Sequence, residues 1–336
     1  MKSVICNEPG DLTLVEREAP VVRDGYSIVR VSRVGICGTD LHIFGGKHPF
    51  LEYPRVMGHE FSGEVTESLG EGSLPAGTQV IVNPYIACGE CRACRKGKPN
   101  CCSNISVLGV HADGALQEFV SVPNRALIAY DGLTPEEAAS VEFFAIGMHS
   151  INRSGIAAGD HVLVAGSGPI GLGICLIALS RGAKVVLLDL NGDRLENAQN
   201  RFGLEAVVRA GENAAEELAA LTDNEMFDIV FDATGNIHSI HNSFTYVGQG
   251  GTLCLVSVVK DDLCFPDPSF HARELTIVGS RNSTNQDFAD VVELIKSGAL
   301  DVNQFVTHTM TLEEVPDVFS GLPAEQDSLI KAMVSV

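Results

Sequence analysis

The fold of this chain is decided by the stretch His161-Val162-Leu163-Val164-Ala165-Gly166-Ser167-Gly168-Pro169-Ile170-Gly171. A short, mainly apolar run leads into three glycines with G-x-G-x-x-G spacing, and a helix-length segment follows. In this context the glycines let the backbone approach a pyrophosphate, which the helix N-terminus stabilises. The stretch therefore predicts a dinucleotide-binding turn, with these cofactor-binding residues: Gly166, Gly168, Pro169, Ile170 and Gly171.

The residues around this turn alternate between strand-length and helix-length segments. Six apolar runs lie at 161–165, 184–188, 206–208, 228–231, 252–258 and 275–279, and helix-length segments such as Asn191–Arg201 and Asn213–Leu221 separate them. Strands and helices in this alternation predict a doubly wound parallel sheet of the Rossmann type. We expect this domain to span residues 148–282.

The second apolar run ends in Asp189, where an acid accepts hydrogen bonds from the adenosine ribose and repels a 2′-phosphate. This favours NAD over NADP. Arg194 is the nearest following cation; it is a candidate cofactor contact and could weaken the preference. Alternatively, Asp189 could cap the helix that follows it.

The rest of the chain, residues 1–147 and 283–336, has the pattern of a β-rich domain. Tyr26–Val31 alternates as a half-buried strand does, and Gln79–Val82 is a short apolar run. Pro135 opens a helix for which Thr134 and Glu137 form a capping box. The segments 287–300 and 329–336 are a predicted helix and a predicted strand, and the strand is expected to rejoin the first domain.

Four cysteines in this region, Cys88, Cys91, Cys94 and Cys102, have the spacing of a closed tetrahedral zinc site. The neighbouring Cys101 could exchange roles with Cys102. A second set of ligand types, Cys37, His59 and Glu60, offers one thiolate, one imidazole and one carboxylate, which suits a catalytic zinc with an open position. The alternative for this set is a buried cysteine, a satisfied histidine and a solvated glutamate.

The composition restricts the partners of the chain. It has 336 residues, 45% hydrophobic and 20% charged, with 43 acidic and 23 basic side chains and a net charge of −20. This balance opposes binding to nucleic acid or to an anionic membrane. The N-terminus lacks a signal-peptide pattern, and the uncharged stretch 162–180 fits a strand, a turn and a helix better than a membrane span. Ten cysteines, with a cluster from Cys88 to Cys102, indicate metal binding in a reducing compartment, the cytoplasm.

With its motifs in this order, the chain resembles the zinc-containing medium-chain dehydrogenase/reductase family over essentially its whole length. It is most similar to the polyol, threonine and sugar-acid dehydrogenases, including bacterial oxidoreductases of polyols and of aldonates such as L-galactonate. Three segments carry this closer likeness: Gly109–Gly114, Asp267–His271 and Gly279–Asn282. The resemblance implies a GroES-like β-barrel catalytic domain followed by the Rossmann domain.

Carried over by position, the resemblance implies that Cys37, His59 and Glu60 hold the catalytic zinc. It places Glu142 beside the metal, although relatives follow this glutamate with proline where the present chain has Phe143. Thr39 and His42 fall on proton-relay positions, and Asp40 is expected to orient the ligands. The residues implied beside the nicotinamide are Thr234, Ser280 and Arg281.

The implied activity is the reversible oxidation of a secondary alcohol by NAD, with zinc as Lewis acid and two zinc ions per chain. The substrate is expected to be a sugar acid or a polyol, and the assembly a homodimer or homotetramer. Candidate cations for a substrate carboxylate are Lys47, His48, Arg55, His111 and Arg281. A sorbitol-like or L-threonine-type dehydrogenase is the main alternative; a non-enzymatic NAD-binding protein is the other.

Overall fold

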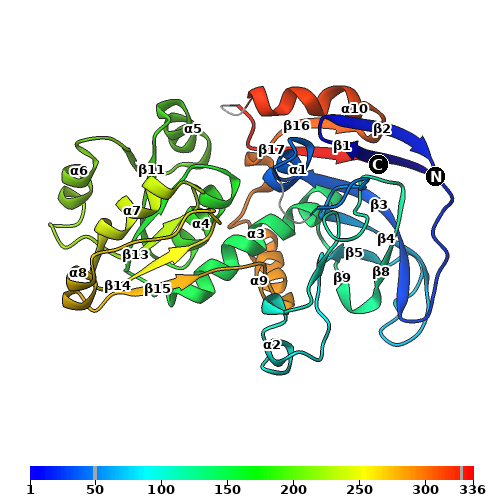
Figure 1. Ribbon diagram of the computed structural model, residues 1–336, viewed down its shortest axis with the longest axis horizontal. Helices are drawn as coiled ribbons and strands as arrows, with labels where there is room; N and C mark the ends of the chain where they lie inside the picture. Colours follow the sequence, from blue (N-terminus) through cyan, green and yellow to red (C-terminus); the bar gives the residue numbers. More distant parts are fainter. Residues whose placement is uncertain (48–50, 326–327) are drawn as a thin grey trace. The chain divides into compact units, whose positions relative to one another are not determined.

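A computed structural model describes residues 1–47, 51–325 and 328–336. The chain forms two compact units, one of residues 1–143 with 283–336 and the other of residues 144–282 (Figure 1). The division falls within helix α3 (Pro135–Ser154), as does the expected boundary after residue 147.

The unit of residues 144–282 is built on a six-stranded parallel sheet. Its strand order is β12 (Ala206–Arg209), β11 (Lys184–Asp189), β10 (His161–Ala165), β13 (Phe227–Asp232), β14 (Val247–Leu255) and β15 (Thr276–Gly279). This confirms the predicted doubly wound sheet. The order of connection reverses between β10 and β13, so the glycine turn after β10 lies at the switch point where such sheets bind ligands. The strand expected at 252–258 begins earlier because Val247–Gly251, despite their three glycines, already extend alongside β13.

The helices of this unit are α4 (Pro169–Ser180), α5 (Gly192–Phe202), α6 (Ala214–Ala220), α7 (Ile237–Tyr246) and α8 (Asp267–Ala272). Helices α4 and α7 contact the sheet strands (Figure 1), and a core that includes Leu163, Val230 and Leu253 fills the space beside it. The uncharged stretch 162–180 forms β10, the glycine turn and α4, as expected. Within the described ranges, none of the helices combines the length and apolarity needed to cross a membrane.

Within its described residues, the other unit contains a sheet of seven strands and two sheets of two strands each. The larger sheet runs β16 (Val306–Thr311), β17 (Lys331–Ser335), β3 (Tyr26–Ile36), β4 (Glu60–Ser68), β5 (Gln79–Val82) and β9 (Leu127–Ala129), with β8 (Phe119–Pro123) also paired to β3. The two-stranded sheets are β1 (Lys2–Glu8) with β2 (Asp11–Glu16), and β6 (Tyr85–Ile86) with β7 (Ser106–Val107). Buried side chains such as Val29, Phe61 and Leu116 form the core.

The expected return of the chain end to the first domain is confirmed. Strand β17 pairs antiparallel with β3, with Ala332 opposite Ile36, and parallel with β16 (red beside orange in Figure 1). The start of β17 therefore lies beside the end of β3, immediately before Cys37.

The described helices of this unit are α1 (Gly38–Phe44), α2 (Arg92–Arg95), the first part of α3, α9 (Asn285–Lys296) and α10 (Val315–Val318). The predicted capping box of α3 is confirmed, because the Thr134 amide donates to Glu137 Oε2 at 2.7 Å and the Glu137 amide to Thr134 Oγ1 at 3.2 Å. Helix α9 starts before the expected residue 287, because Thr284 and Asp287 form a capping box, and it ends before Gly298 at φ +76°.

Candidate active site

The end of β3 and the start of β4 bring the first group of predicted metal ligands together. Cys37 follows β3 directly, Glu60 begins β4, and the antiparallel register sets Gly35 opposite Glu60. One ligand atom from each of Cys37, His59 and Glu60 lies within 4.8 Å of the others. The exposed fractions of His59 and Glu60 are 5% and 0%. The alternative of a solvated Glu60 is therefore wrong.

Glycines leave the space that the side chains of the predicted metal ligands and their loops occupy. A Cβ atom on Gly35 would collide with the Glu60 carboxylate. Gly58, which precedes His59, has φ +90°, and a Cβ there would lie 2.8 Å from Val34 Cγ1. The turn 109–114 supports the same loop, since the Gly114 amide donates to the Val56 carbonyl at 2.7 Å. The His59 ring is thus held by a turn that larger residues could not form.

Asp40 connects the two ligand-bearing loops. Its fully buried carboxylate accepts hydrogen bonds from the amides of Cys37 at 2.9 Å and Gly58 at 3.2 Å. Burial favours the neutral acid, but the His59 charge and these amides outweigh it and hold the pKa of Asp40 below its ordinary value. Asp40 Oδ1 lies 3.7 Å from His59 Nδ1, a buried nitrogen that has no hydrogen-bond partner among the described residues.

These residues fit a catalytic zinc. The donor set combines a thiolate, an imidazole and a carboxylate, all of which zinc accepts. With His59 Nε2 on a metal, Nδ1 would face the Asp40 carboxylate, the usual arrangement that fixes a ligating histidine.

Two side chains of this centre were missed by the sequence analysis. Lys331, 3% exposed, donates to both Glu60 oxygens, at 2.8 and 2.7 Å. Tyr85 donates its hydroxyl hydrogen to Glu142 Oε1. Neither residue stands in a motif. The sheet register brings Lys331 to the predicted metal ligands, and the fold of the loop after β5 brings Tyr85 there.

Glu142 lies on α3 and is 2% exposed. Burial raises its pKa to about 7, and burial together with the neighbouring Glu142 charge raises the pKa of Tyr85 well above its ordinary value. Glu142 is not among the three side chains whose ligand atoms lie together. Its reach to the metal stays a prediction.

The two residues at proton-relay positions lie on α1. The Cys37 thiol can donate to Thr39 Oγ1 at 3.8 Å, so the Thr39 hydroxyl lies next to a predicted metal ligand. His42, further along α1, is exposed to solvent. This order, from the metal ligand outward, is the one a relay requires, and the roles of both residues stay predictions.

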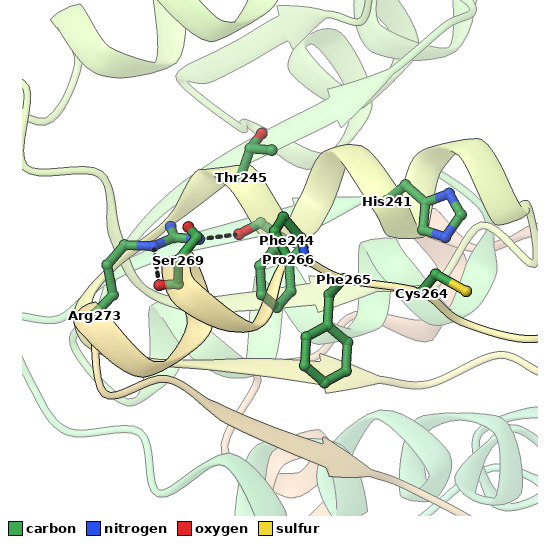
Figure 2. Close-up of a pocket in the computed structure, with 8 residues that line it drawn as sticks. All are labelled: His241, Phe244, Thr245, Cys264, Phe265, Pro266, Ser269 and Arg273. Carbon is green, nitrogen blue, oxygen red and sulfur yellow. Dashed lines mark hydrogen bonds between the residues drawn. The ribbon is translucent and has the colours of Figure 1, made fainter.

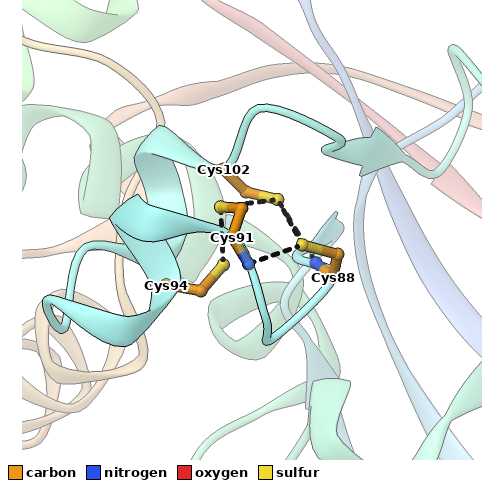
Figure 3. Close-up of side chains that lie close together, drawn as sticks. All are labelled: Cys88, Cys91, Cys94 and Cys102. Carbon is orange, nitrogen blue, oxygen red and sulfur yellow. Dashed lines mark hydrogen bonds between the residues drawn. The ribbon is translucent and has the colours of Figure 1, made fainter.

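The second cysteine group forms a compact cluster on the loop around α2 (Figure 3). The Cys91 Sγ atom lies 3.5 Å from Cys94 Sγ and 3.9 Å from Cys102 Sγ, and Cys102 Sγ lies 3.5 Å from Cys88 Sγ. Backbone hydrogen bonds, first from Cys94 and then from Ser103, lower the pKa of Cys91 to about 5 and favour its thiolate. Cys102 is buried whereas Cys101 is exposed, so Cys102 is the fourth member.

The conformation of the turn after β10 requires glycine at two of its positions. Gly166 has φ +103°, and a Cβ on Gly171 would collide with the Gly166 carbonyl oxygen. Pro169 and Ile170 begin α4 behind the N-cap Gly168. Asp189 Oδ2 accepts from the amide and the hydroxyl of Ser167, both at 2.7 Å.

The alternative that Asp189 caps the following helix is wrong, because Asn191 is the N-cap of α5 and accepts from the amides of Asp193 and Arg194. Asp189 instead accepts from the Asn191 amide at 2.9 Å through Oδ1. Arg194 lies in the first turn of α5, next to this edge of the sheet.

The remaining predicted cofactor residues follow the carboxyl ends of β13 and β15. Thr234 Oγ1 donates to Asp232 Oδ1 at 2.7 Å, and Thr234 is exposed. The Ser280 amide donates to the Leu255 carbonyl at 2.9 Å, whereas Ser280 Oγ has no hydrogen-bond partner in the part of the chain that the structure describes. Arg281 is exposed. Because the strands are parallel, these residues and the glycine turn lie at the same edge of the sheet.

Comparison with known proteins decides the family. The family model of the alcohol dehydrogenase GroES-like domain matches residues 23–132, and that of the zinc-binding dehydrogenase matches residues 169–297. L-galactonate-5-dehydrogenase of Escherichia coli K12 is 40% identical over 337 aligned residues, covering 100% of this chain and 99% of the relative. The chain belongs to the zinc-containing medium-chain alcohol dehydrogenase family.

Solved structures of such dehydrogenases have the same fold. The alcohol dehydrogenase rspB from E. coli CFT073, crystallised with NADH, has a TM-score of 0.92 and 30% identity, covering 100% of this chain and 99% of that one. A zinc-binding dehydrogenase from Sinorhizobium meliloti 1021, bound to NADP, has a TM-score of 0.90 and 27% identity with the same coverage. Both of these structures contain a bound nicotinamide cofactor.

A cavity of about 450 Å³ in the 144–282 unit of this dehydrogenase is separate from the cofactor edge (Figure 2). It is lined by His241, Phe244, Thr245, Cys264, Phe265, Pro266, Ser269 and Arg273. Arg273 donates to the carbonyl of Val247, the first residue of β14, which places the cavity near the amino ends of the strands. None of the predicted cofactor residues lines it.

Proposed function

We propose that this zinc-type dehydrogenase oxidises a secondary alcohol of a sugar acid, such as L-galactonate, with NAD. The observation that carries the proposal is the convergence of Cys37, His59 and Glu60, with Asp40 behind them, in a chain whose second unit has a dinucleotide turn. The identity to L-galactonate-5-dehydrogenase supports the choice of substrate class.

The residues of the chain perform distinct parts of this reaction. When bound, zinc supplies Lewis acidity that favours loss of the hydroxyl proton, and NAD accepts the hydride. Cys37, His59 and Glu60 hold the metal, and Asp40 orients His59. Thr39 takes the substrate proton beside Cys37 as it releases its own hydroxyl proton toward the exposed His42, which returns a proton to solvent.

NAD is the proposed cofactor because Asp189 ends β11, where dinucleotide-binding folds of this kind bind the adenosine ribose. A carboxylate there repels the 2′-phosphate of NADP and can accept hydrogen bonds from ribose hydroxyls. We propose Gly166, Gly168, Pro169, Ile170 and Gly171 for the pyrophosphate, and Arg194, Thr234, Ser280 and Arg281 as further contacts.

We also propose two zinc ions per chain, the second in the cluster of Cys88, Cys91, Cys94 and Cys102. Four thiolates close a tetrahedral site and leave no position for substrate, so this ion would stabilise the loop around α2. Cysteines that bind a metal instead of forming disulfides fit a reducing compartment, which supports a cytoplasmic location.

We also propose, from the resemblance to the family, that the chain forms a homodimer or a homotetramer. Measuring the mass of the assembly in solution tests this.

The structure narrows the candidate cations for a substrate carboxylate. Arg55 is paired with Asp113 at 3.4 Å, and His111 Nδ1 accepts from the Val107 amide at 3.1 Å. Lys47 and Arg281 are exposed, whereas His48 lies outside the described residues. Lys47 is therefore the candidate that we propose for the substrate carboxylate, and Arg281 stays a proposed cofactor contact.

The test is NADH formation with aldonates and with the alditols of matching configuration. A sugar-acid enzyme turns over the aldonate faster, and Lys47→Met should raise KM for the aldonate by about tenfold while leaving any alditol turnover unchanged. Lys296→Met, which removes a surface cation paired with Asp131, is the matched control. Preference for the alditol would instead establish the sorbitol-like alternative.

A further inference from the structure

The buried ammonium group of Lys331 is part of the catalytic metal site. Its Nζ atom donates to Glu60 Oε1 at 2.8 Å, to Glu60 Oε2 at 2.7 Å and to the Ile36 carbonyl at 3.4 Å. A lysine ammonium has three hydrogens to donate, so all three are used. Both oxygens of one predicted zinc ligand are thus already bound by a cation of the protein.

Lys331 reaches this position through the register of three strands. Ala332 of β17 pairs with Ile36 of β3, and Gly35 of β3 pairs with Glu60 of β4. Lys331 therefore lies beside the point where β3 ends at Cys37. Because Gly35 has no side chain, the Glu60 carboxylate can fill the space above it.

Phe143 supports the same ammonium group from another direction. Lys331 Nζ lies 4.5 Å from the centroid of the Phe143 ring, which is within the range of a cation–π interaction. The ring is 1% exposed and packs against Phe305 at 5.5 Å. The buried Phe143 ring therefore helps to hold the Lys331 ammonium group in place.

The site holds several acidic groups around this one ammonium. The Cys37 thiol, Glu60 and Glu142 all lie near enough to act on the charge of Lys331. In the absence of metal, Lys331 compensates for buried negative charge that would otherwise be unpaired, which is costly. A divalent ion at Cys37, His59 and Glu60 would have to share the Glu60 carboxylate with it.

We propose that Lys331, held on the Phe143 ring, shares the Glu60 carboxylate with the catalytic metal and thereby limits how tightly this site binds zinc. Lys331 and Phe143 are positioning residues, acting on the metal through Glu60. This inference rests on the zinc site of the proposed function.

The test is zinc binding to the full chain in competition with a chromophoric chelator. Cys37→Ser, which retains only the four-cysteine site, supplies the baseline for the structural ion. Lys331→Met should bind the catalytic zinc at least about tenfold more tightly, because a repulsive unit charge close to the ion is removed. Lys331→Arg keeps the charge and should bind as the wild type does. Phe143→Leu keeps the apolar volume but loses the ring, so it should shift affinity in the same direction by a smaller factor.

A second measurement separates this role from simple packing. Lys331→Met should lower the thermal midpoint of the zinc-free protein and recover it when zinc is added. A packing role would lower both midpoints equally and leave zinc affinity unchanged, which would overturn the inference. If Lys331→Met does not fold, Phe143→Leu decides, and unchanged or weaker zinc binding by that variant overturns it. If Cys37→Ser binds as much zinc as the wild type, the catalytic metal site itself is absent, and the proposed function fails with the inference.

Discussion

At the scale of single residues, Glu142 sets a pH dependence of stability. Its folded-state pKa of about 7 lies above the ordinary value of 4.5 because the side chain is buried. The folded protein therefore holds this proton more tightly than the unfolded chain. The contribution of Glu142 to stability is greatest below pH 4.5, declines as the pH rises toward 7 and is constant above that.

Glu142→Gln removes this titration and can still accept the Tyr85 hydrogen bond. Zinc-free Glu142→Gln should exceed the zinc-free wild type in stability at pH 8 by on the order of 3 kcal/mol. The difference should vanish near pH 4. Denaturant unfolding across this pH range measures it, and parallel curves for the two proteins would show that burial does not raise this pKa.

Asp189 is the residue on which cofactor choice depends. Replacing it by serine removes the charge that opposes a 2′-phosphate and the acceptor for Ser167 and Asn191. Asp189→Ser should reduce the kcat/KM preference for NAD over NADP by roughly a hundredfold. Initial rates with both cofactors provide the measurement, with Asp193→Ser, in the first turn of the next helix, as the control. An unchanged ratio would exclude Asp189 as the selector.

At the scale of elements, the turn before His59 depends on glycine. Gly58→Ala places a side chain at φ +90° and against Val34, at a cost of roughly 1–3 kcal/mol, and should move His59 enough to lose one zinc ion per chain. Gly77→Ala has a similar φ of +87° but open space around it. The control should be less destabilised and keep its full zinc content. Equal zinc content in the two variants would contradict the role of the crowded turn.

Sequence patterns predicted the features that depend on residues close together in the sequence. The cysteine spacing, the glycine turn and the alternation of strands and helices each depend on neighbouring residues, and the six parallel strands and the cysteine cluster follow from them. Lys331 and Tyr85 could not be found in this way. Lys331 joins Glu60 only through the register of β17 on β3, and a single lysine in an apolar strand carries no signal of its partner.

At the scale of the whole molecule, the two units should respond to different ligands. NAD would bind the 144–282 unit and zinc the other, and binding to the folded state alone stabilises by about 2.7 kcal/mol at a hundredfold excess over Kd. Calorimetry should show NAD raising one transition and chelation lowering another. A Cys37→Ser chain should keep the NAD effect, and a single transition that shifts equally with both ligands would show that the units unfold together.

The most direct measurement compares NADH formation by the wild type and Cys37→Ser on a sugar acid, with NAD binding followed in the same samples. The account predicts that Cys37→Ser loses turnover by at least about a thousandfold while its Kd for NAD changes less than about threefold. Retained turnover by Cys37→Ser, or by wild type stripped of zinc, would contradict the claim that Cys37, His59 and Glu60 form the catalytic metal site.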